Sequence, residues 1–222
     1  DFEKIKALQP DLIIGNKEEN EKEQIEELMQ HYNVWMSDIY TLKDALAMIM
    51  SIGALVGKNE AATNLKLEIE YQFHEFLNPA LPGSSQTAFN PPSTILYPDF
   101  SHLNSQISAL SVAYFIWRKP YMVAGHDTFI NQMLNVCGFE NVFTNRGSRY
   151  PEITSEELIK ANPSIVLLSS EPYPFKEQHM LEIQQLLPAA KIKIVDGEIF
   201  SWYGSRLLKA PAYFKKLQAS LA

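Results

Sequence analysis

The sequence has 222 residues, of which 46% are hydrophobic and 20% charged, and its net charge is −7. This is enough chain for one large domain or two modest lobes of ordinary globular composition. The acidic balance argues against nucleic-acid binding, which requires a basic face. No apolar run reaches the roughly 18 residues needed to cross a bilayer, and a single cysteine excludes an intrachain disulfide.

The first part of the chain alternates short helix and strand patterns. Residues 2–10 predict an amphipathic helix that Pro10 ends, and the apolar run 11–15 predicts a buried strand. The next expected elements are a charged helix, a strand and two helices, at 16–32, 33–38, 42–57 and 59–77. Thr41 is placed to cap the helix at 42–57, with Asp44 in the first turn of that helix.

The composition changes over residues 79–109, which hold five prolines and several serines. A connection this long tends to be functional or disordered. The alternation then resumes, with strands expected at 111–117, 164–169 and 191–197 and helices at 128–138, 155–163, 176–188 and 211–221. Residues 124–127 read as the start of the first of these helices. Strands that alternate with helices predict an α/β fold with mostly parallel sheets.

A weak internal repeat favours two similar lobes. Segments 3–14 and 156–168 each combine a helix, a proline stop (Pro10 or Pro163) and a buried strand. Each is followed by a charged helix and a second strand that leads to an aspartate. If the repeat is real, it predicts two α/β lobes joined by one long helix; the alternative is chance similarity between helix–strand units.

Catalytic and metal-binding motifs are missing from the sequence. It contains no G-x-S-x-G, P-loop, G-x-G-x-x-G, H-E-x-x-H or C-x-x-C pattern. No two of the five histidines have a helical ligand spacing. The sequence therefore predicts a binding protein that is not an enzyme, with no catalytic residues, no protein-bound metal and no cofactor of its own.

Three aromatic-rich turns, at 117–121, 145–157 and 200–211, contain the candidate ligand-binding residues. These are Trp117, Tyr121, Tyr150, Trp202, Tyr203 and Arg206. Ligands of open α/β sheets bind beyond the carboxyl ends of strands. Aromatic faces with a few cations suit a large, flat, partly anionic ligand, and Arg118 or Lys119 would offer charge to its edge. The alternatives are aromatic rings that pack on their own lobe and loop cations that are solvated.

Residues 154–157 read as a capping box, in which Thr154 caps a helix and Glu157 reaches back to the cap N–H. Glu156 is then left on the outer side of the first turn. It serves either as a favourable charge near the helix dipole or as a contact for a basic partner.

Four segments together resemble the periplasmic solute-binding proteins of ABC importers for cobalamin and ferric siderophores. They are residues 7–28, 125–143, 149–168 and 195–206. The resemblance is closest to the cobalamin-binding members and covers nearly the whole chain except the loop at 79–109. It implies two α/β lobes with a ligand cleft between them: an N-terminal lobe at 1–57, a backbone helix at 58–78 and a C-terminal lobe at 79–222.

The resemblance also implies a function. The protein would capture cobalamin or another corrinoid, a ferric siderophore or haem, and deliver it to the permease and ATPase complex of an importer. It would be a monomer in the periplasm, free or lipid-anchored, with the signal segment and the first strands of the N-terminal lobe outside this chain. Asn16 stands where some cobalamin binders carry a pocket tryptophan. Glu156 matches the C-lobe glutamate that docks onto permease arginines, and Glu21 is chosen as its N-lobe partner.

Two other functions are compatible with the pattern. The first is an enzyme of the chelatase-like two-lobe architecture that acts on a tetrapyrrole through His126 or His179. The second is a receptor for a free metal ion, which would need several histidine or carboxylate ligands to converge.

Overall fold

The computed structural model describes residues 1–79 and 110–221 of the chain. They belong to two compact units, residues 1–39 and 40–222, and the fold is mixed α/β as predicted. The predicted Pro-rich loop, except Pro79, lies outside the described residues. The expected lobe boundaries at 57 and 78 stay predictions. No helix in the described residues has the length and apolar character needed to span a membrane.

The unit formed by residues 1–39 is a two-stranded parallel sheet with a helix before each strand. Its elements are α1 (Phe2–Leu8), β1 (Ile13–Asn16), α2 (Lys22–Met29) and β2 (Val34–Ser37). The two strands pair in parallel along their whole length, as expected for neighbouring strands that a helix connects. Ile25 and Leu28 form the buried side of α2.

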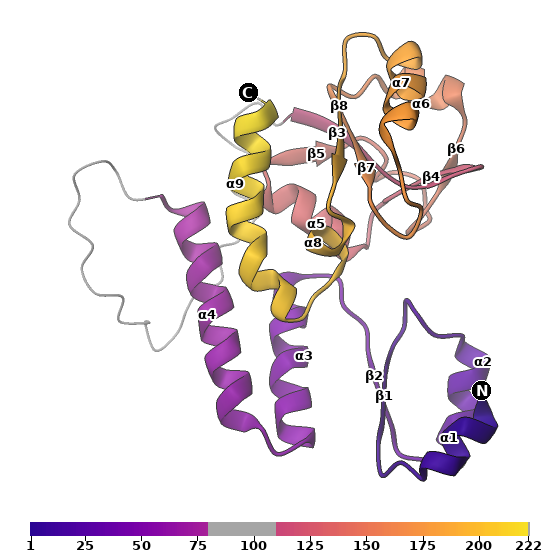
Figure 1. Ribbon diagram of the computed structural model, residues 1–222, viewed down its shortest axis with the longest axis vertical. Helices are drawn as coiled ribbons and strands as arrows, with labels where there is room; N and C mark the ends of the chain where they lie inside the picture. Colours follow the sequence, from indigo (N-terminus) through magenta and orange to yellow (C-terminus); the bar gives the residue numbers. More distant parts are fainter. Residues whose placement is uncertain (80–109, 222) are drawn as a thin grey trace. The chain divides into compact units, whose positions relative to one another are not determined.

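The unit formed by residues 40–222 contains a six-stranded sheet (Figure 1). Its strands are β3 (Leu110–Arg118), β4 (Tyr121–Val123), β5 (Phe139–Asn141), β6 (Glu152–Ile153), β7 (Ile165–Ser169) and β8 (Lys191–Val195). Its helices are α3 (Leu42–Leu55), α4 (Asn59–Leu77), α5 (Phe129–Val136), α6 (Ser155–Ala161), α7 (Glu177–Leu186), α8 (Gly197–Ser201), the 3-10 helix η2 (Ser205–Lys209) and α9 (Ala210–Leu221).

The strand order is β6-β4-β3-β7-β8, with β5 also paired to β3. β3, β5, β7 and β8 are parallel to one another, whereas β4 and β6 are antiparallel to their neighbours. Val112 pairs with Asn141 of β5 and with Ile165 of β7, so these two strands flank β3 on opposite edges. The prediction of a mostly parallel sheet is therefore confirmed.

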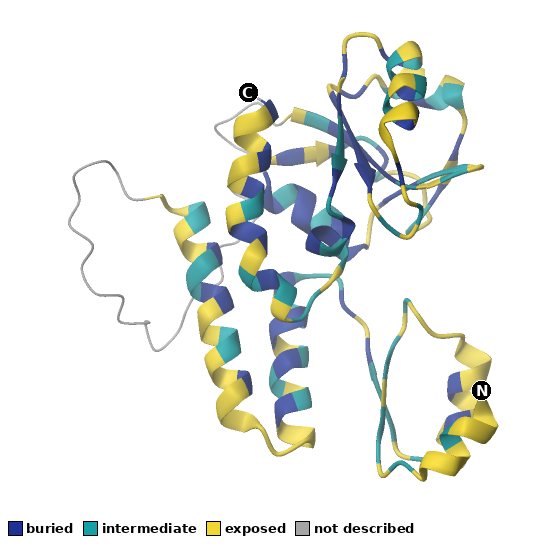
Figure 2. Cartoon of the chain, viewed as in Figure 1, coloured by how far each residue is buried: buried dark blue, intermediate teal, exposed yellow. Residues whose placement is uncertain are grey.

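Helices α6 and α7 cover one face of the sheet. Phe115 of β3 and Leu168 of β7 are fully buried there, together with Leu158 of α6 and Ile183 of α7. Figure 2 shows β7 and the middle of β3 in the colour of buried residues. Such strands, which are buried on both faces, read as continuous apolar runs, and this explains why the sequence predicted them well.

The other face of the sheet packs against an aromatic cluster from the C-terminal helices. The rings of Tyr114 and Phe200 lie 5.1 Å apart, and those of Phe200 and Phe214 lie 5.2 Å apart. Phe76 of α4 extends this cluster, with its ring 6.0 Å from that of Phe214. The long helix α4, predicted at 59–77 and found at those residues, is thus anchored on α9.

Side-chain caps set several helix ends. Thr41 and Thr154 both form the predicted capping boxes, with Asp44 and Glu157 as their partners. The expected helix start at 124–127 is wrong. Tyr121–Val123 joins the sheet as β4, and the helix begins only after Thr128, whose hydroxyl accepts a hydrogen bond from the Asn131 N–H at 3.0 Å.

The internal repeat is visible in the structure. The strand pairs β1–β2 and β7–β8 are both parallel, and a helix precedes each strand in both. Helix α1 ends at Gln9 with φ 44° and ψ 57°, and α6 ends at Asn162 with φ 44° and ψ 55°. Both left-handed caps directly precede a proline, Pro10 or Pro163. A shared end geometry of this kind supports a true repeat of the helix–strand unit.

We expect Leu168→Ala to lower the free energy of unfolding by about 2–5 kcal/mol, because it leaves a cavity in the core. The matched control is Leu181→Ala on α7, where 67% of the side chain is exposed and the change should stay within about 0.5 kcal/mol. Urea unfolding followed by circular dichroism measures both. Equal losses in the two variants would contradict the described core.

Candidate ligand-binding site

Three parallel strands end at one edge of the large sheet. β3, β7 and β8 run in the same direction, so the turn after β3 and the segments 170–176 and 196–206 lie at their carboxyl ends. This is the edge at which open α/β sheets bind ligands. The side chains that we name the carboxyl rim are Trp117, Glu171, Tyr173, Asp196, Trp202 and Arg206.

Glu171, the second residue after β7, organises one side of the carboxyl rim. Its Oε1 accepts hydrogen bonds from the Ser201 hydroxyl at 3.0 Å and from the Trp202 indole N–H at 2.9 Å. Gly197 allows this close approach, because a Cβ there would lie 2.6 Å from the Cγ of Glu171. Trp202 remains 52% exposed, so its indole is oriented by the N–H while much of the side chain stays open to a ligand.

Arg206 is held by two carboxylates. Its guanidinium donates to Asp196 and lies 3.1 Å from Glu198. The backbone N–H of Asp196 in turn donates to the Tyr213 hydroxyl at 2.9 Å. Arg206 therefore belongs to a network that fixes the segment after β8, and its predicted contact with the ligand stays a prediction.

Trp117, at the end of β3, forms the other side of the carboxyl rim. It is 40% exposed and makes an edge-to-face contact with Tyr173, with ring centres 5.6 Å apart. The backbone N–H of Tyr173 donates to the carbonyl of Ile116 at 3.3 Å. The segment after β7 thus lies against the exit of β3.

The neighbouring residues Arg118 and Tyr121 contact α7. Two nitrogens of the Arg118 guanidinium donate to Glu182, at 3.1 and 2.6 Å, and the Tyr121 hydroxyl donates to the same carboxylate. The hydrogen bond from Arg118 lowers the pKa of Glu182. Burial, followed by the bond to Glu182, raises the pKa of Tyr121 to about 12. These contacts tie the β3–β4 hairpin to α7.

The two remaining predicted residues lie apart in the sheet order. Tyr203 follows β8 and packs edge-to-face on Phe129, with ring centres 5.4 Å apart. Tyr150 lies in the turn before β6, which is at the opposite end of the strand order from β8. The structure therefore brings Trp117, Trp202 and Arg206 to one edge, with Tyr203 directly after Trp202 in sequence. It places Tyr121 at the start of β4 and Tyr150 in the turn before β6.

Sequence reasoning missed Glu171, Tyr173 and Glu182. Glu171 and Tyr173 follow a strand that was predicted correctly, so the rule about carboxyl ends would have found them had it been applied to that strand. Glu182 lies in the middle of α7 and reads as an ordinary surface carboxylate. No local pattern indicates its contact with Tyr121, 61 positions away.

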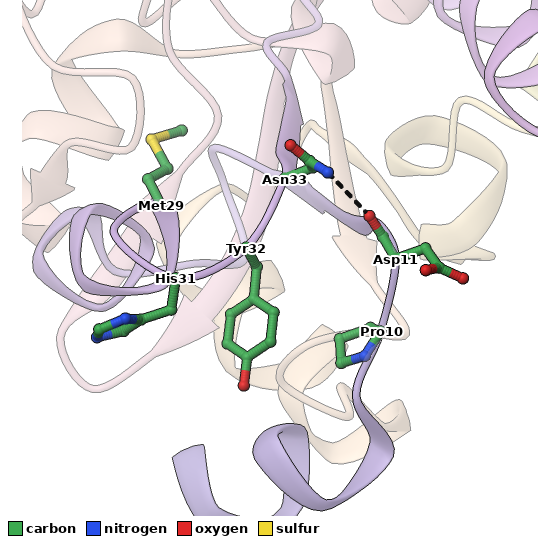
Figure 3. Close-up of a pocket in the computed structure, with 6 residues that line it drawn as sticks. All are labelled: Pro10, Asp11, Met29, His31, Tyr32 and Asn33. Carbon is green, nitrogen blue, oxygen red and sulfur yellow. Dashed lines mark hydrogen bonds between the residues drawn. The ribbon is translucent and has the colours of Figure 1, made fainter.

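A depression of about 420 Å³ lies in the unit formed by residues 1–39 (Figure 3). Its lining residues are Pro10, Asp11, Met29, His31, Tyr32 and Asn33. The Asn33 amide donates to the carbonyl of Asp11 at 3.2 Å and so joins the segments that lead into β1 and β2. The depression is thus at the amino ends of these strands, the edge opposite to the one where α/β sheets bind ligands.

The histidines proposed for a chelatase-like enzyme have other contacts. His126 is exposed and lies 2.9 Å from Asp127. His179 is buried, and its Nδ1 accepts the backbone N–H of Lys176 at 2.9 Å. Among the described residues, no group of three or more histidine, cysteine or acidic side chains is placed to hold a metal ion.

Comparison with known proteins finds vitamin B12-binding and heme-binding proteins. No protein-family model matches the chain. The vitamin B12-binding protein of Pectobacterium carotovorum subsp. carotovorum (strain PC1) is 24% identical over 214 residues, which cover 94% of this chain and 67% of that protein. The structure of the periplasmic vitamin B12 binding protein BtuF of Vibrio cholerae has a TM-score of 0.73 at 17% identity and covers 98% of this chain and 78% of BtuF. The periplasmic heme-binding protein BhuT in complex with two hemes has a TM-score of 0.75 at 18% identity, over 100% of this chain and 80% of BhuT.

The chain is thus similar in sequence to vitamin B12-binding proteins over 94% of its length, and it shares the fold of periplasmic vitamin B12- and heme-binding proteins. The predicted resemblance and fold class are thereby confirmed. Solute-binding proteins of this kind are typically not enzymes, and their partners are a small ligand and an importer. The shared fold includes proteins named for vitamin B12 and for heme, so the fold itself does not separate these two ligands.

The two glutamates predicted to dock the protein on a permease are both exposed. Glu156 is the second residue of α6, and hydrogen bonds from its own backbone N–H and from Thr154 lower its pKa. Glu21 is the N-cap residue of α2 and accepts a hydrogen bond from Gln24 at 2.7 Å. The repeat relates α6 to α1 rather than to α2, and the residue in α1 at the position of Glu156 is Glu3, also exposed.

We expect the buried His179 to make the stability of the protein depend on pH. Burial, followed by the charge of Arg118, lowers the pKa of His179. The unfolded chain takes up a proton near the ordinary imidazole value of about 6.5, so the free energy of unfolding should fall as the pH drops through that value. His179→Gln keeps a capping-box acceptor and should flatten this dependence.

Chemical denaturation at a series of pH values measures the effect. The matched control is His126→Gln, at an exposed histidine, which should keep the wild-type slope. If His179→Gln also keeps that slope, the capping role assigned to the neutral imidazole is wrong.

Proposed function

We propose that this protein captures a large metal chelate at the carboxyl rim and delivers it to the permease of an ABC importer. The ligand class is a corrinoid such as cobalamin, a ferric siderophore or haem. The observation that carries the proposal is the pair of exposed indoles, Trp117 and Trp202, at the ligand-binding edge of a fold shared with vitamin B12 and heme binders. Such rings offer a large apolar area with a fixed orientation.

The protein would hold the ligand without reacting with it. Polar groups of the carboxyl rim orient aromatic side chains, as the hydrogen bond from Trp202 to Glu171 does. We place the protein in the periplasm, free or lipid-anchored, as a monomer whose helix at 58–78 links an N-terminal and a C-terminal lobe. The family typically lacks enzymatic activity, which supports a pure binding role.

We expect Trp202→Ala to weaken the binding of the preferred chelate about tenfold, because a lost aromatic contact of about 1.4 kcal/mol corresponds to that factor. Trp202→Phe keeps a stacking ring and should lose less. Isothermal titration with cyanocobalamin, haemin and a panel of ferric siderophores measures the affinities. Leu181→Ala, at an exposed site on α7, is the control for an unrelated apolar truncation. Wild-type protein that binds none of these chelates would refute the proposed function.

We propose Glu156 and Glu3 as the pair of docking glutamates, in place of Glu156 and Glu21. The internal repeat supports this choice, because each residue is two positions after the N-cap of its helix, Thr154 or Asp1. Both carboxylates are exposed near a helix N-terminus, where they are available to permease arginines.

We expect Glu156→Lys and Glu3→Lys each to reduce stimulation of the importer ATPase at least tenfold, since each reverses one docking charge. Glu21→Lys should have a much smaller effect. The measurement uses the cognate permease–ATPase complex in proteoliposomes, with ligand binding checked separately by titration. A loss with Glu21→Lys and none with Glu3→Lys would restore the sequence-based choice.

A further inference from the structure

The charges at the carboxyl rim are predominantly negative. Three carboxylates, Glu171, Asp196 and Glu198, follow β7 and β8 at this edge, and the guanidinium of Arg206 already binds two of them, Asp196 and Glu198. Arg118, the other guanidinium at this edge, is held by α7 through two hydrogen bonds. Both arginines therefore have anionic partners within the protein. Of the side chains that make up the carboxyl rim, the one left to offer charge to a ligand is therefore a carboxylate; Lys119, in the turn after β3, is an exposed cation outside this set.

Glu171 is the carboxylate best placed to meet a ligand. Its Oε1 is saturated by Ser201 and Trp202, whereas its Oε2 has no hydrogen-bond partner within residues 1–79 and 110–221. The side chain packs over Gly197, where an added Cβ would come within 2.6 Å of its Cγ. The carboxylate is thus fixed beside the exposed indole with one oxygen left to accept a hydrogen bond.

We infer that Glu171 is a specificity-determining residue, which selects chelates that present neutral or cationic hydrogen-bond donors next to Trp202 and rejects chelates that present carboxylates there. The inference rests on the proposed function and narrows its ligand class. The carboxamide groups of a corrinoid satisfy Oε2 directly. The propionates of haem would bring a like charge to the partly buried Glu171 and would leave Oε2 without a donor, and both effects disfavour binding.

This selection differs from the sequence-based expectation of a partly anionic ligand. That expectation rested on Arg118, Lys119 and Arg206 as free cations. The structure gives two of them carboxylate partners, Glu182 for Arg118 and the pair Asp196 and Glu198 for Arg206.

The test compares cyanocobalamin with haemin in wild-type protein and in Glu171→Gln. Glutamine has nearly the same shape and keeps an oxygen for Ser201 and Trp202, but it replaces the anionic oxygen by an NH₂ donor. Wild-type protein should bind cyanocobalamin more tightly than haemin. In Glu171→Gln the ratio of the two affinities should fall at least tenfold. Glu140→Gln, at an exposed position of β5 next to the amino end of β3, is the matched control and should leave the ratio unchanged.

A second measurement needs no variant. Raising the salt concentration from about 50 mM to about 500 mM shortens the screening length, so haemin should bind wild-type protein more tightly, while cyanocobalamin should change little. Haemin that binds wild-type protein as tightly as cyanocobalamin, or a ratio unaffected by Glu171→Gln, overturns the role of Glu171 and leaves the proposed function intact. Failure of every chelate to bind overturns both.

Discussion

The segment that follows β7, residues 170–176, is the constraint on which the carboxyl rim depends. Its backbone N–H groups donate in turn to β8 at 2.9 Å, to β3 at 3.3 Å and to His179 at the start of α7 at 2.9 Å. Three separate elements thus hold one short connection. Glu171 and Tyr173 lie in this connection, and each contacts one of the exposed tryptophans. Glu171 accepts a hydrogen bond from Trp202, and Tyr173 makes an edge-to-face contact with Trp117. A site preorganised in this way loses little entropy when a rigid ligand binds.

The same framework keeps the charges near the site constant. The pKa of Glu182 is lowered by its hydrogen bond from Arg118, so this pair remains charged at neutral pH. The pKa of His179 is lowered by burial, so the imidazole remains neutral. Catalytic sites commonly have groups poised to exchange protons near neutral pH, and here both shifts move the groups away from it. Side chains whose protonation does not change near neutral pH suit a binding site that holds a ligand and releases it unaltered.

Local physics made much of the fold predictable from the sequence. The helix at 59–77, the capping boxes at Thr41 and Thr154 and the buried strands all depend on neighbours within a few positions. The strand β4 was missed because three residues directly after a tight turn carry too short a pattern. The roles of Arg118 and Tyr121 were also out of reach, since both depend on Glu182, more than 60 positions away. Sequence could place aromatic and cationic residues at an edge, but only the structure shows which charges are already neutralised.

The internal repeat shows why helix ends are better reference points than strands for comparing the two halves of the chain. If the docking glutamate of the N-terminal half is sought in the helix that follows the first strand, the helix is α2 and the residue is Glu21. The left-handed caps at Gln9 and Asn162, each followed by proline, instead align α1 with α6. A cap geometry of this kind tolerates few residue types and no shift by one position, whereas a charged helix face looks alike in several registers. The alignment by caps therefore gives the firmer correspondence, and it pairs Glu3 with Glu156.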